Sequence, residues 1–385
     1  MVKLLLLGAS GSIGKQTLDV IKKYPSSFSL VGFSVGRNVR YISLILKHFK
    51  DVKDIYLIEE KKKKYYQKKY PYINFYSGDN GLEELINQSD FDMLVNALVG
   101  FVGMKPTLLG IKKNVDIALA NKESLVVAGE LINNLLKTSK SKIYPIDSEH
   151  SAIYKCLKVD NKDVDKLILT ASGGAFRNKK YEELNNVTVI DALNHPTWKM
   201  GAKITIDSAT MVNKAFEIIE AHYLFNYPYK KIDVLLHDES HIHSLVRYHN
   251  GAYRADISKP DMRGPIKCAL FKYDLPFKTY VSDDYHNFNK SFHFKDFDIN
   301  RYPLVGLAQV VLTKKGNSGA MFNASNEGAV YAFLNGQIKF LDIEYIIQEC
   351  MNKVEYISSP TLEDLVITHQ KTLELVSKLI KELNE

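Results

Sequence analysis

The stretch VKLLLLGASGSIG, residues 2–14, decides the fold of the N-terminal part of this chain. Its first six residues form an apolar run typical of a buried parallel strand. Three glycines spaced G-x-x-G-x-x-G follow, and residues 15–22 have a helical pattern. A strand that enters a helix through such a turn presents backbone amides at the positive end of the helix dipole. We therefore predict a dinucleotide pyrophosphate site here, although a purely structural strand-to-helix turn also fits this spacing.

Apolar runs alternate with helical patterns as far as residue 147, which predicts a Rossmann-like α/β fold with a parallel sheet covered by helices. The further predicted strands are 28–35, 54–58, 92–98, 116–120 and 142–146. The predicted strand 28–35 runs into Gly36-Arg37-Asn38, where NAD-selective sites place an acid that binds the ribose hydroxyls. Because Arg37 stands there without a nearby acid, we predict NADP and assign its 2′-phosphate to Arg37.

After residue 147 the pattern changes to a mixture of strands, polar stretches and helices. We predict strands at 166–170, 203–206, 234–236, 242–248 and 252–257, helices at 209–225, 323–334 and 361–383, and a hairpin turn at Asn250-Gly251. The polar stretch 172–202 has the length of a mobile lid. We predict four parts: a dinucleotide-binding domain (1–147), a central α/β catalytic domain (148–271) with the lid and dimerisation strands, a linker (272–300) and a C-terminal helical domain (301–385).

Composition excludes several classes of protein. No run of 18 apolar residues occurs, so no membrane segment is expected, and three widely spaced cysteines indicate no disulfide framework. We expect a cytoplasmic protein, although an organelle precursor with its leader removed would look the same. The net charge of +7 and the lysines of residues 61–69 are explained better by a solvated helix face than by nucleic-acid binding.

Two clusters carry candidate chemistry. Asp147 and Glu149 end a predicted strand at the carboxyl edge of the sheet, where a period of two would point both carboxylates to one side. Hard oxygen ligands suit Mg²⁺ or Mn²⁺, but a helix-capping role for Asp147 and Ser148 is an equal alternative.

The second cluster lies in residues 207–217, where we expect a strand to enter a helix. Ser208, Asn213 and Lys214 supply donors suited to a phosphate at a helix start, and Glu217, four residues after Asn213, could complete a carboxylate trio. A capping box is the alternative here. The single tryptophan, Trp198, is expected to pack in the lid or to close over a ligand.

Taken together, the motifs resemble the 1-deoxy-D-xylulose-5-phosphate reductoisomerase family over nearly the whole chain. The matching stretches, after the glycine turn, are Asn121-Lys122-Glu123, Asp147-Ser148-Glu149-His150-Ser151, Thr170-Ala171-Ser172-Gly173-Gly174, residues 195–201, residues 203–217, Pro260-Asp261-Met262-Arg263 and Asn323-Ala324-Ser325-Asn326-Glu327.

The resemblance implies a homodimeric enzyme of the non-mevalonate isoprenoid (MEP) pathway and the expected target of fosmidomycin. It would convert 1-deoxy-D-xylulose 5-phosphate to 2-C-methyl-D-erythritol 4-phosphate with NADPH and Mg²⁺, Mn²⁺ or Co²⁺. The substrate is then a small sugar phosphate, with no nucleic-acid or membrane partner. Two alternatives to such an enzyme are a metal-free NADP dehydrogenase and a module that only binds NADPH or nucleic acid.

The resemblance also implies roles for individual residues. The metal ligands would be Asp147, Glu149 and Glu217. The phosphate would be held by Ser172, Ser208, Asn213 and Lys214, and the rest of the substrate by Lys122, Ser148 and His195, with Trp198 and Met200 in the lid. The cofactor would be lined by Gly8, Ser10, Gly11, Ser12, Ile13, Gly36, Arg37, Asn38, Asn121, Glu123 and Gly201.

Some positions depart from the family pattern. Residues 237–240 read His-Asp-Glu-Ser where the family usually has His-Pro-Gln-Ser, and His241 replaces an apolar residue. Ser10, Thr197 and Asp256 replace a usual Thr, Asn and Gln. None removes an implied metal ligand or phosphate contact, so we expect activity with altered tuning.

Overall fold

The computed structural model describes residues 1–274 and 291–385 and divides into two compact units. The first unit comprises Met1–Ser124, Leu131–Asp147 and Asp261–Tyr280, and the second comprises Leu125–Glu130, Ser148–Pro260 and Val281–Glu385. Most of the predicted linker 272–300 lies outside the described residues. The four-part division stays a prediction.

The first unit is built on a seven-stranded sheet in which every pairing is parallel, with strand order β4-β3-β2-β1-β5-β6-β7. The strands are β1 (Val2–Leu7), β2 (Phe28–Ser34), β3 (Asp54–Tyr56), β4 (Asn74–Tyr76), β5 (Met93–Asn96), β6 (Asp116–Leu119) and β7 (Ile143–Pro145). The last four residues of β1 are fully buried. A strand buried on both faces has no polar face, which is why its sequence is a continuous apolar run. The predicted parallel α/β sheet is confirmed.

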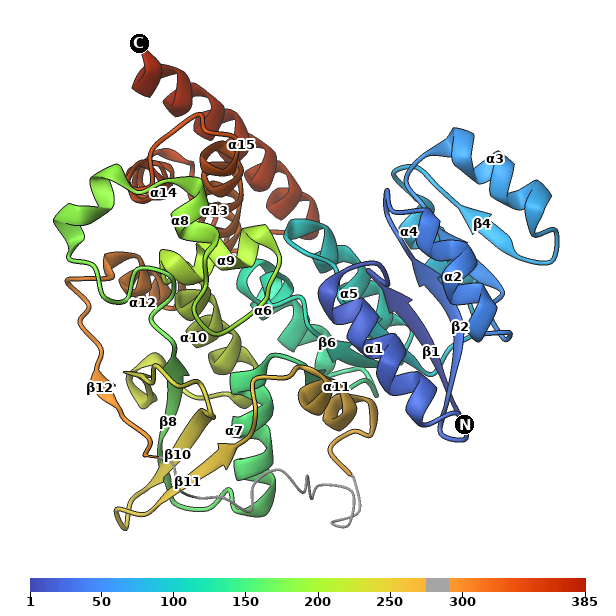
Figure 1. The fold of residues 1–385 in the computed structure, drawn as a ribbon, viewed down its shortest axis with the longest axis horizontal. Coiled ribbons are helices and arrows are strands. Elements are labelled where there is room, and N and C mark those ends of the chain that lie inside the picture. The colour runs from blue at the N-terminus through green and yellow to red at the C-terminus, as the bar shows by residue number, and fades with distance from the viewer. Residues whose placement is uncertain (275–290) are drawn as a thin grey trace. The chain divides into compact units, whose positions relative to one another are not determined.

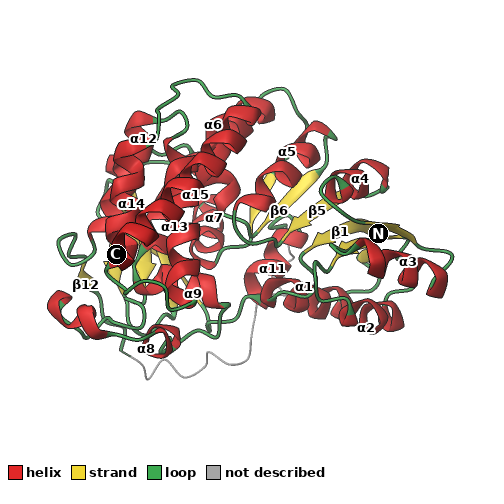
Figure 2. Ribbon diagram, turned by 90° about the horizontal axis from the view of Figure 1, so that it is seen from above, coloured by secondary structure: helices red, strands yellow, loops and turns green. Residues whose placement is uncertain are grey.

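Helices cover both faces of this sheet. They are α1 (Ser12–Lys23), α2 (Arg40–His48), α3 (Glu60–Lys69), α4 (Gly81–Gln88), α5 (Met104–Lys112) and α11 (Arg263–Leu270), and α6 (Glu123–Leu136) begins here. Figure 2 shows α4 and α5 on one side of the strands and α1, α2 and α11 on the other. The arrangement gathers the ends of several strands and the starts of their helices at one sheet edge, where ligands of open α/β sheets bind.

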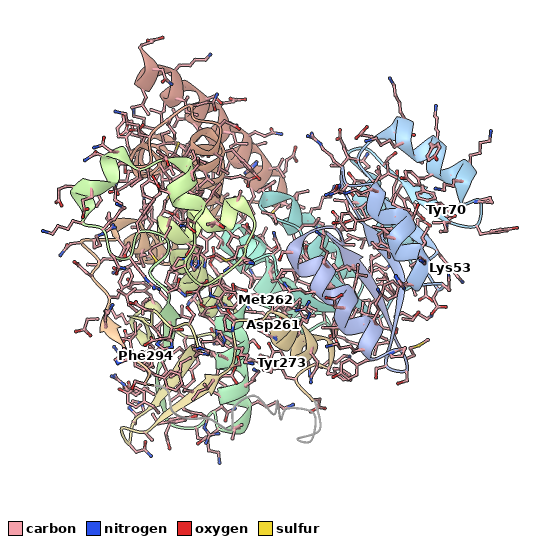
Figure 3. All side chains as sticks on the ribbon, in the orientation of Figure 1. Lys53, Tyr70, Asp261, Met262, Tyr273 and Phe294 are labelled. Carbon is pink, nitrogen blue, oxygen red and sulfur yellow. The ribbon has the colours of Figure 1, made fainter. Side chains whose placement is uncertain are left out.

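The segment that contains α11 is distant in the sequence but also belongs to the first unit. Helix α11 packs against α1, and the Phe271 ring lies edge-on to Tyr24 and Phe28 at centroid distances of 5.2 and 4.8 Å. The Tyr273 hydroxyl, labelled in Figure 3, donates to the Pro145 carbonyl at the end of β7 at 2.6 Å. These contacts fix the last strand of the sheet, directly before Asp147.

The second unit contains a mixed five-stranded sheet with order β11-β10-β8-β9-β12. Its strands are β8 (Val164–Ala171), β9 (Ile232–Leu236), β10 (Ile242–Tyr248), β11 (Tyr253–Ile257) and β12 (Lys295–Asp296). The predicted hairpin turn is confirmed, because β10 and β11 pair antiparallel and Gly251 has φ +84°. Helix α7 (Ser148–Val159) packs on β10 and β11, and α10 (Val212–Phe225) packs on β8 and β9.

The remaining helices of the second unit are α8 (Val189–Leu193), α9 (Ala202–Ala209), α12 (Leu307–Lys314), α13 (Ser318–Leu334), α14 (Asp342–Lys353) and α15 (Leu362–Asn384). Helix α13 packs against α14 and α15, which appear in orange to red in Figure 1. One apolar core joins these helices to the inner face of the sheet. The C-terminal residues are therefore helical as predicted. In the described part of the chain, no helix is long and apolar enough to span a bilayer.

Two local predictions are wrong, and one strand was not predicted. Residues 203–206 lie in α9 and form no strand, so cluster 207–217 joins two helices, with α10 beginning at Val212. Glu149 lies in the first turn of α7 and not in a strand, because β7 already ends at Pro145. The short strand β4 was not predicted.

Candidate active site

The glycine turn joins the end of β1 to the start of α1 with the backbone geometry that the sequence predicts. Gly8 has φ +83°, and a Cβ there would lie 2.4 Å from the Ala97 carbonyl oxygen at the end of β5. A Cβ on Gly14 would lie 2.2 Å from the Gly8 carbonyl oxygen. Only glycine therefore allows the turn to approach the sheet this closely.

The turn leaves the first amides of α1 available to an anion. Its first intrahelical hydrogen bond runs from Lys15 N to the Gly11 carbonyl at 3.0 Å, so the amides of Ser12 and Ile13 precede the helical ladder. Gly11 is the N-cap residue, and no acidic side chain lies in the first turn. This geometry can hold a pyrophosphate.

Asn121 and Glu123, both predicted to line the cofactor, form a buried network with the loop after β5. Asn121 Nδ2 donates to the carbonyls of Leu98 and Gly100 at 3.0 and 2.9 Å. Glu123 Oε1 accepts from Gly100 N at 3.0 Å. Their polar atoms hold this loop at the sheet edge, which indicates that they shape the site through its backbone.

Two further predicted residues of the first unit are brought together. Lys122 is buried and its ammonium forms an ion pair with Asp147 Oδ2. Asp147 is the residue directly before α7, so only Ser148 separates it from Glu149 in the chain. The Asp147 carboxylate thus lies against a cation at the end of the sheet.

In the second unit, two predicted metal ligands share one cation. Lys214 Nζ lies 3.2 Å from Glu149 Oε1, also donates to Glu217 Oε2, and donates to the Thr170 carbonyl at 2.5 Å. Lys214 and Glu217 are almost completely buried, with 2% and 1% of their surfaces exposed. Two carboxylates this close would repel each other without the positive charge between them.

Neighbouring side chains fix the positions of these carboxylates. Asn213 Nδ2 donates to Glu217 Oε1 across one turn of α10, which confirms the predicted shared face. Ser148 Oγ donates to Glu149 Oε2 at 2.5 Å. His150 Nε2 lies 2.9 Å from the Glu217 carbonyl oxygen and ties α7 to α10.

The donor set fits a hard divalent cation. Glu149 and Glu217 offer carboxylate oxygens, which Mg²⁺ and Mn²⁺ prefer. The Lys214 ammonium now stands where positive charge is required, between the two groups. These two carboxylates therefore suit a divalent metal ion, and Asp147 as a third ligand stays a prediction.

Ser172 and His195 meet at the carboxyl end of β8. Ser172 Oγ lies 3.1 Å from His195 Nε2, while His195 Nδ1 accepts from the backbone N of Thr197 and Trp198 at 3.1 and 3.0 Å. Burial, reinforced by the Arg177 charge, lowers the His195 pKa to about 4. The ring is therefore neutral at pH 7 with its proton on Nε2, so it is a hydrogen-bond donor facing Ser172.

Two predicted phosphate contacts, Ser172 and Ser208, are joined through a close backbone approach. Gly174 has φ +69°, and a Cβ there would lie 2.4 Å from the Ser208 carbonyl oxygen. The next turn begins at Met211, which is left-handed at φ +62° and starts α10 with Asn213 and Lys214. The structure thus places all four predicted phosphate donors around β8, α9 and α10.

Lid residues also lie in the second unit. Trp198 packs near His243, with 6.0 Å between ring centroids. Gly201 is the N-cap residue of α9, and a Cβ there would meet nothing within 4 Å. Met200 directly precedes Gly201, so the predicted cofactor and lid residues are adjacent in the chain.

The acids at positions 238 and 239 have local partners. Glu239 Oε1 lies 2.6 Å from His293 Nδ1, and Asp238 Oδ2 accepts from Lys295 Nζ at 2.7 Å. Both partners belong to the segment at β12, and neither is Lys214. The added acids thus bind this segment to the end of β9.

Arg177 is a site residue that the sequence did not reveal. Its Nη1 donates to the carbonyls of Ser172 and Asp238 at 3.4 and 3.1 Å, and its charge faces His195. An arginine in a polar stretch carries no signal by spacing alone. Its role depends on a contact over 61 residues of chain.

Buried histidines near the site should make folding stability depend on pH. Desolvation is the largest cause that lowers the pKa of both His195 and His243 from 6.5 to about 4. Below pH 6.5 these histidines bind protons in the unfolded chain but stay neutral in the folded protein. The free energy of unfolding should therefore fall as the pH falls from 6.5 to 4. Urea unfolding from pH 7.5 to 4.5 should show this loss. A His195→Asn, His243→Asn double variant should show a shallower loss, and an unchanged slope would contradict the assignment.

Comparison with known proteins identifies the family of this chain. Family models described as 1-deoxy-D-xylulose 5-phosphate reductoisomerase, its C-terminal domain, and DXP reductoisomerase C-terminal domain match residues 4–129, 143–225 and 257–375. A relative of that name from Lysinibacillus sphaericus is 44% identical over 384 residues, covering 99% of this chain and 100% of its own. Another from Listeria innocua is 41% identical over 385 residues, with coverage of 99% and 100%.

Solved structures of similar proteins share the whole fold. A DOX-P reductoisomerase crystallised with NADPH, fosmidomycin and magnesium is 33% identical, with a TM-score of 0.91 and full coverage of both chains. The 1-deoxy-D-xylulose 5-phosphate reductoisomerase from Zymomonas mobilis, in complex with NADPH, is 34% identical with a TM-score of 0.88 and coverage of 98% and 99%. The chain therefore belongs to the 1-deoxy-D-xylulose 5-phosphate reductoisomerase family.

Proposed function

We propose that this chain converts 1-deoxy-D-xylulose 5-phosphate to 2-C-methyl-D-erythritol 4-phosphate with NADPH and a divalent metal ion. It thereby acts in non-mevalonate isoprenoid biosynthesis. The observation that carries the proposal is the pair Glu149 and Glu217 held by one buried ammonium, that of Lys214. Solved relatives contain NADPH and magnesium, which agrees with both cofactors.

The proposed residue roles follow from these positions. Asp147, Glu149 and Glu217 hold the metal, and Ser172, Ser208, Asn213 and Lys214 hold the phosphate. Lys122, Ser148 and His195 contact the rest of the substrate, and Trp198 and Met200 close the lid. The cofactor is lined by Gly8, Ser10, Gly11, Ser12, Ile13, Gly36, Arg37, Asn38, Asn121, Glu123 and Gly201.

A divalent cation at these carboxylates supplies Lewis acidity for the adjacent hydroxyl and carbonyl oxygens of the substrate, and NADPH supplies the hydride. Glu149 and Glu217 would hold such a cation, and the Lys214 ammonium, which now pairs with both carboxylates, would then be able to bind the substrate phosphate. The phosphate is remote from the reacting carbons of the substrate. Its binding contributes energy that orients the substrate.

His195 has a defined part in this scheme. Because its Nδ1 accepts from the lid backbone, its Nε2 proton is fixed toward Ser172 and can be donated to a substrate oxygen instead. The same bonds connect the ring to Trp198, so closure of the lid and orientation of the donor are coupled. A closed lid excludes water from the reacting carbons.

We also infer a homodimer in the cytoplasm. Strand β11 is at the edge of its sheet, and the exposed side chains of Tyr253 and Ile257 lie along it. An edge strand of this kind can pair with a second copy. The three cysteines are free and buried, which suits a reducing compartment.

The test follows NADPH absorbance with the purified protein, 1-deoxy-D-xylulose 5-phosphate and Mg²⁺. We expect NADPH oxidation that stops in EDTA, returns with excess Mg²⁺ and is inhibited by fosmidomycin. Oxidation that continues in EDTA would instead indicate a metal-free dehydrogenase. NADPH binding without turnover would indicate a binding module.

A further inference from the structure

Cations outside the glycine motif gather beside it in the first unit. Lys15 Nζ, in the first turn of α1, lies 4.8 Å from the centroid of the Tyr41 ring. Arg40 Cζ, at the start of α2, lies 5.5 Å from the same centroid. A hydrogen bond with Lys15 lowers the pKa of the Tyr41 hydroxyl. Both cationic side chains are exposed, as is Arg37 at the end of β2.

This cluster carries excess positive charge. Within residues 1–274 and 291–385, no carboxylate forms an ion pair with Lys15, Arg37 or Arg40. The first turns of α1 and α2 contain no acidic side chain, so both helix dipoles add to the positive potential. Cations that converge without a counter-charge repel each other, and a dianion between them would remove that cost.

The cluster also has the correct position relative to the pyrophosphate site. Gly8 N donates to Ser34 Oγ at 2.8 Å, and Ser10 Oγ donates to the Val35 carbonyl at 3.2 Å. These bonds hold the glycine turn against the end of β2. A dinucleotide with its pyrophosphate at α1 places its adenosine ribose at the end of the second strand. In that position the 2′-phosphate would be near Arg37 and the start of α2, which follows β2 in the chain.

We propose that Lys15 and Arg40, arranged around Tyr41, determine cofactor specificity by binding the adenosine 2′-phosphate of NADPH together with Arg37. The inference rests on the proposed use of a dinucleotide. It goes beyond Arg37, because it makes selectivity a property of two helices and not of one loop residue. NADH lacks this phosphate and gains nothing from either cation.

The experiment measures dissociation constants of NADPH and NADH for the full chain, without substrate or metal. Lys15→Gln and Arg40→Gln should each weaken NADPH about tenfold, the effect of one charge-assisted hydrogen bond, and leave NADH within about twofold. Lys22→Gln and Lys47→Gln remove exposed charges from the far ends of α1 and α2. These two control variants should bind both cofactors like the original chain.

A second pair of ligands identifies the phosphate concerned. Adenosine 2′,5′-bisphosphate should lose affinity in both variants, and 5′-AMP should not. Equal losses for NADPH and NADH would overturn the inference, because they would place the cations at the pyrophosphate. Unchanged NADPH affinity would overturn it as well. If the unmodified chain binds neither dinucleotide, the proposed cofactor itself fails, which is a distinct result.

Discussion

Glu149→Gln should abolish turnover, with a fall in kcat of more than about 10³-fold, because a lost metal ligand removes several kcal/mol of charge stabilisation. The amide keeps the size of the side chain but loses the charge that Lys214 now neutralises. NADPH affinity should stay within about twofold, since the predicted pyrophosphate contacts lie at the glycine turn.

Steady-state kinetics at saturating Mg²⁺ and NADPH titration check both parts of this result. Glu349→Gln is the matched control, because it removes a carboxylate of α14 that pairs with Lys353. That variant should keep full activity. Substantial turnover by Glu149→Gln in saturating Mg²⁺ would reject Glu149 as a metal ligand.

Gly174→Ala should destabilise the protein by about 3 kcal/mol and raise KM for the sugar phosphate. The backbone there is left-handed, and the new methyl group would lie 2.4 Å from the Ser208 carbonyl oxygen. Backbone atoms must move apart to accept it. Ser172 and Ser208, on the two sides of this approach, would then no longer reach the phosphate together.

Urea unfolding and substrate titration measure these effects. Gly264→Ala, in α11, offers a matched control, because a Cβ there meets nothing within 4 Å and the backbone is not left-handed. That variant should change stability by less than about 0.5 kcal/mol. A Gly174→Ala protein with unchanged stability and KM would mean that Ser208 is not held by this contact.

The strands of the first unit other than β4 could be predicted because strands buried on both faces are apolar runs, and the bounds of β1 agree with the predicted residues. The strand predicted at residues 203–206 was wrong for a physical reason as well. Polar and apolar side chains alternate over Lys-Ile-Thr-Ile, which is the period of a strand. In the fold, Lys203 pairs with Asp207 one helical turn away at 2.7 Å, and Asp207 accepts from Asn326 of α13 at 2.8 Å. Tertiary contacts across 119 residues thus override local preference.

Part of the candidate site could likewise be predicted from the sequence, and part could not. Its carboxylates and the predicted phosphate donors lie in motifs that the sequence displays, but their grouping depends on packing. The prediction that Asp147 and Glu149 point to the same side used the period of a strand, whereas Glu149 lies in the first turn of α7, where its carboxylate contacts Lys214. Arg177 and the Tyr41 cluster lie outside every motif, because their neighbours are brought together only by the fold.

Lys214 has a consequence for the metal-free protein. Its ammonium is an internal counter-ion for Glu149 and Glu217, so these carboxylates keep a compensating positive charge when a divalent ion is removed. Loss of the ion should therefore not favour unfolding. Chelation should therefore be reversible. The same ammonium competes with a metal ion for these carboxylates, so it should lower the affinity for the metal. In the absence of the metal, it should keep the site folded.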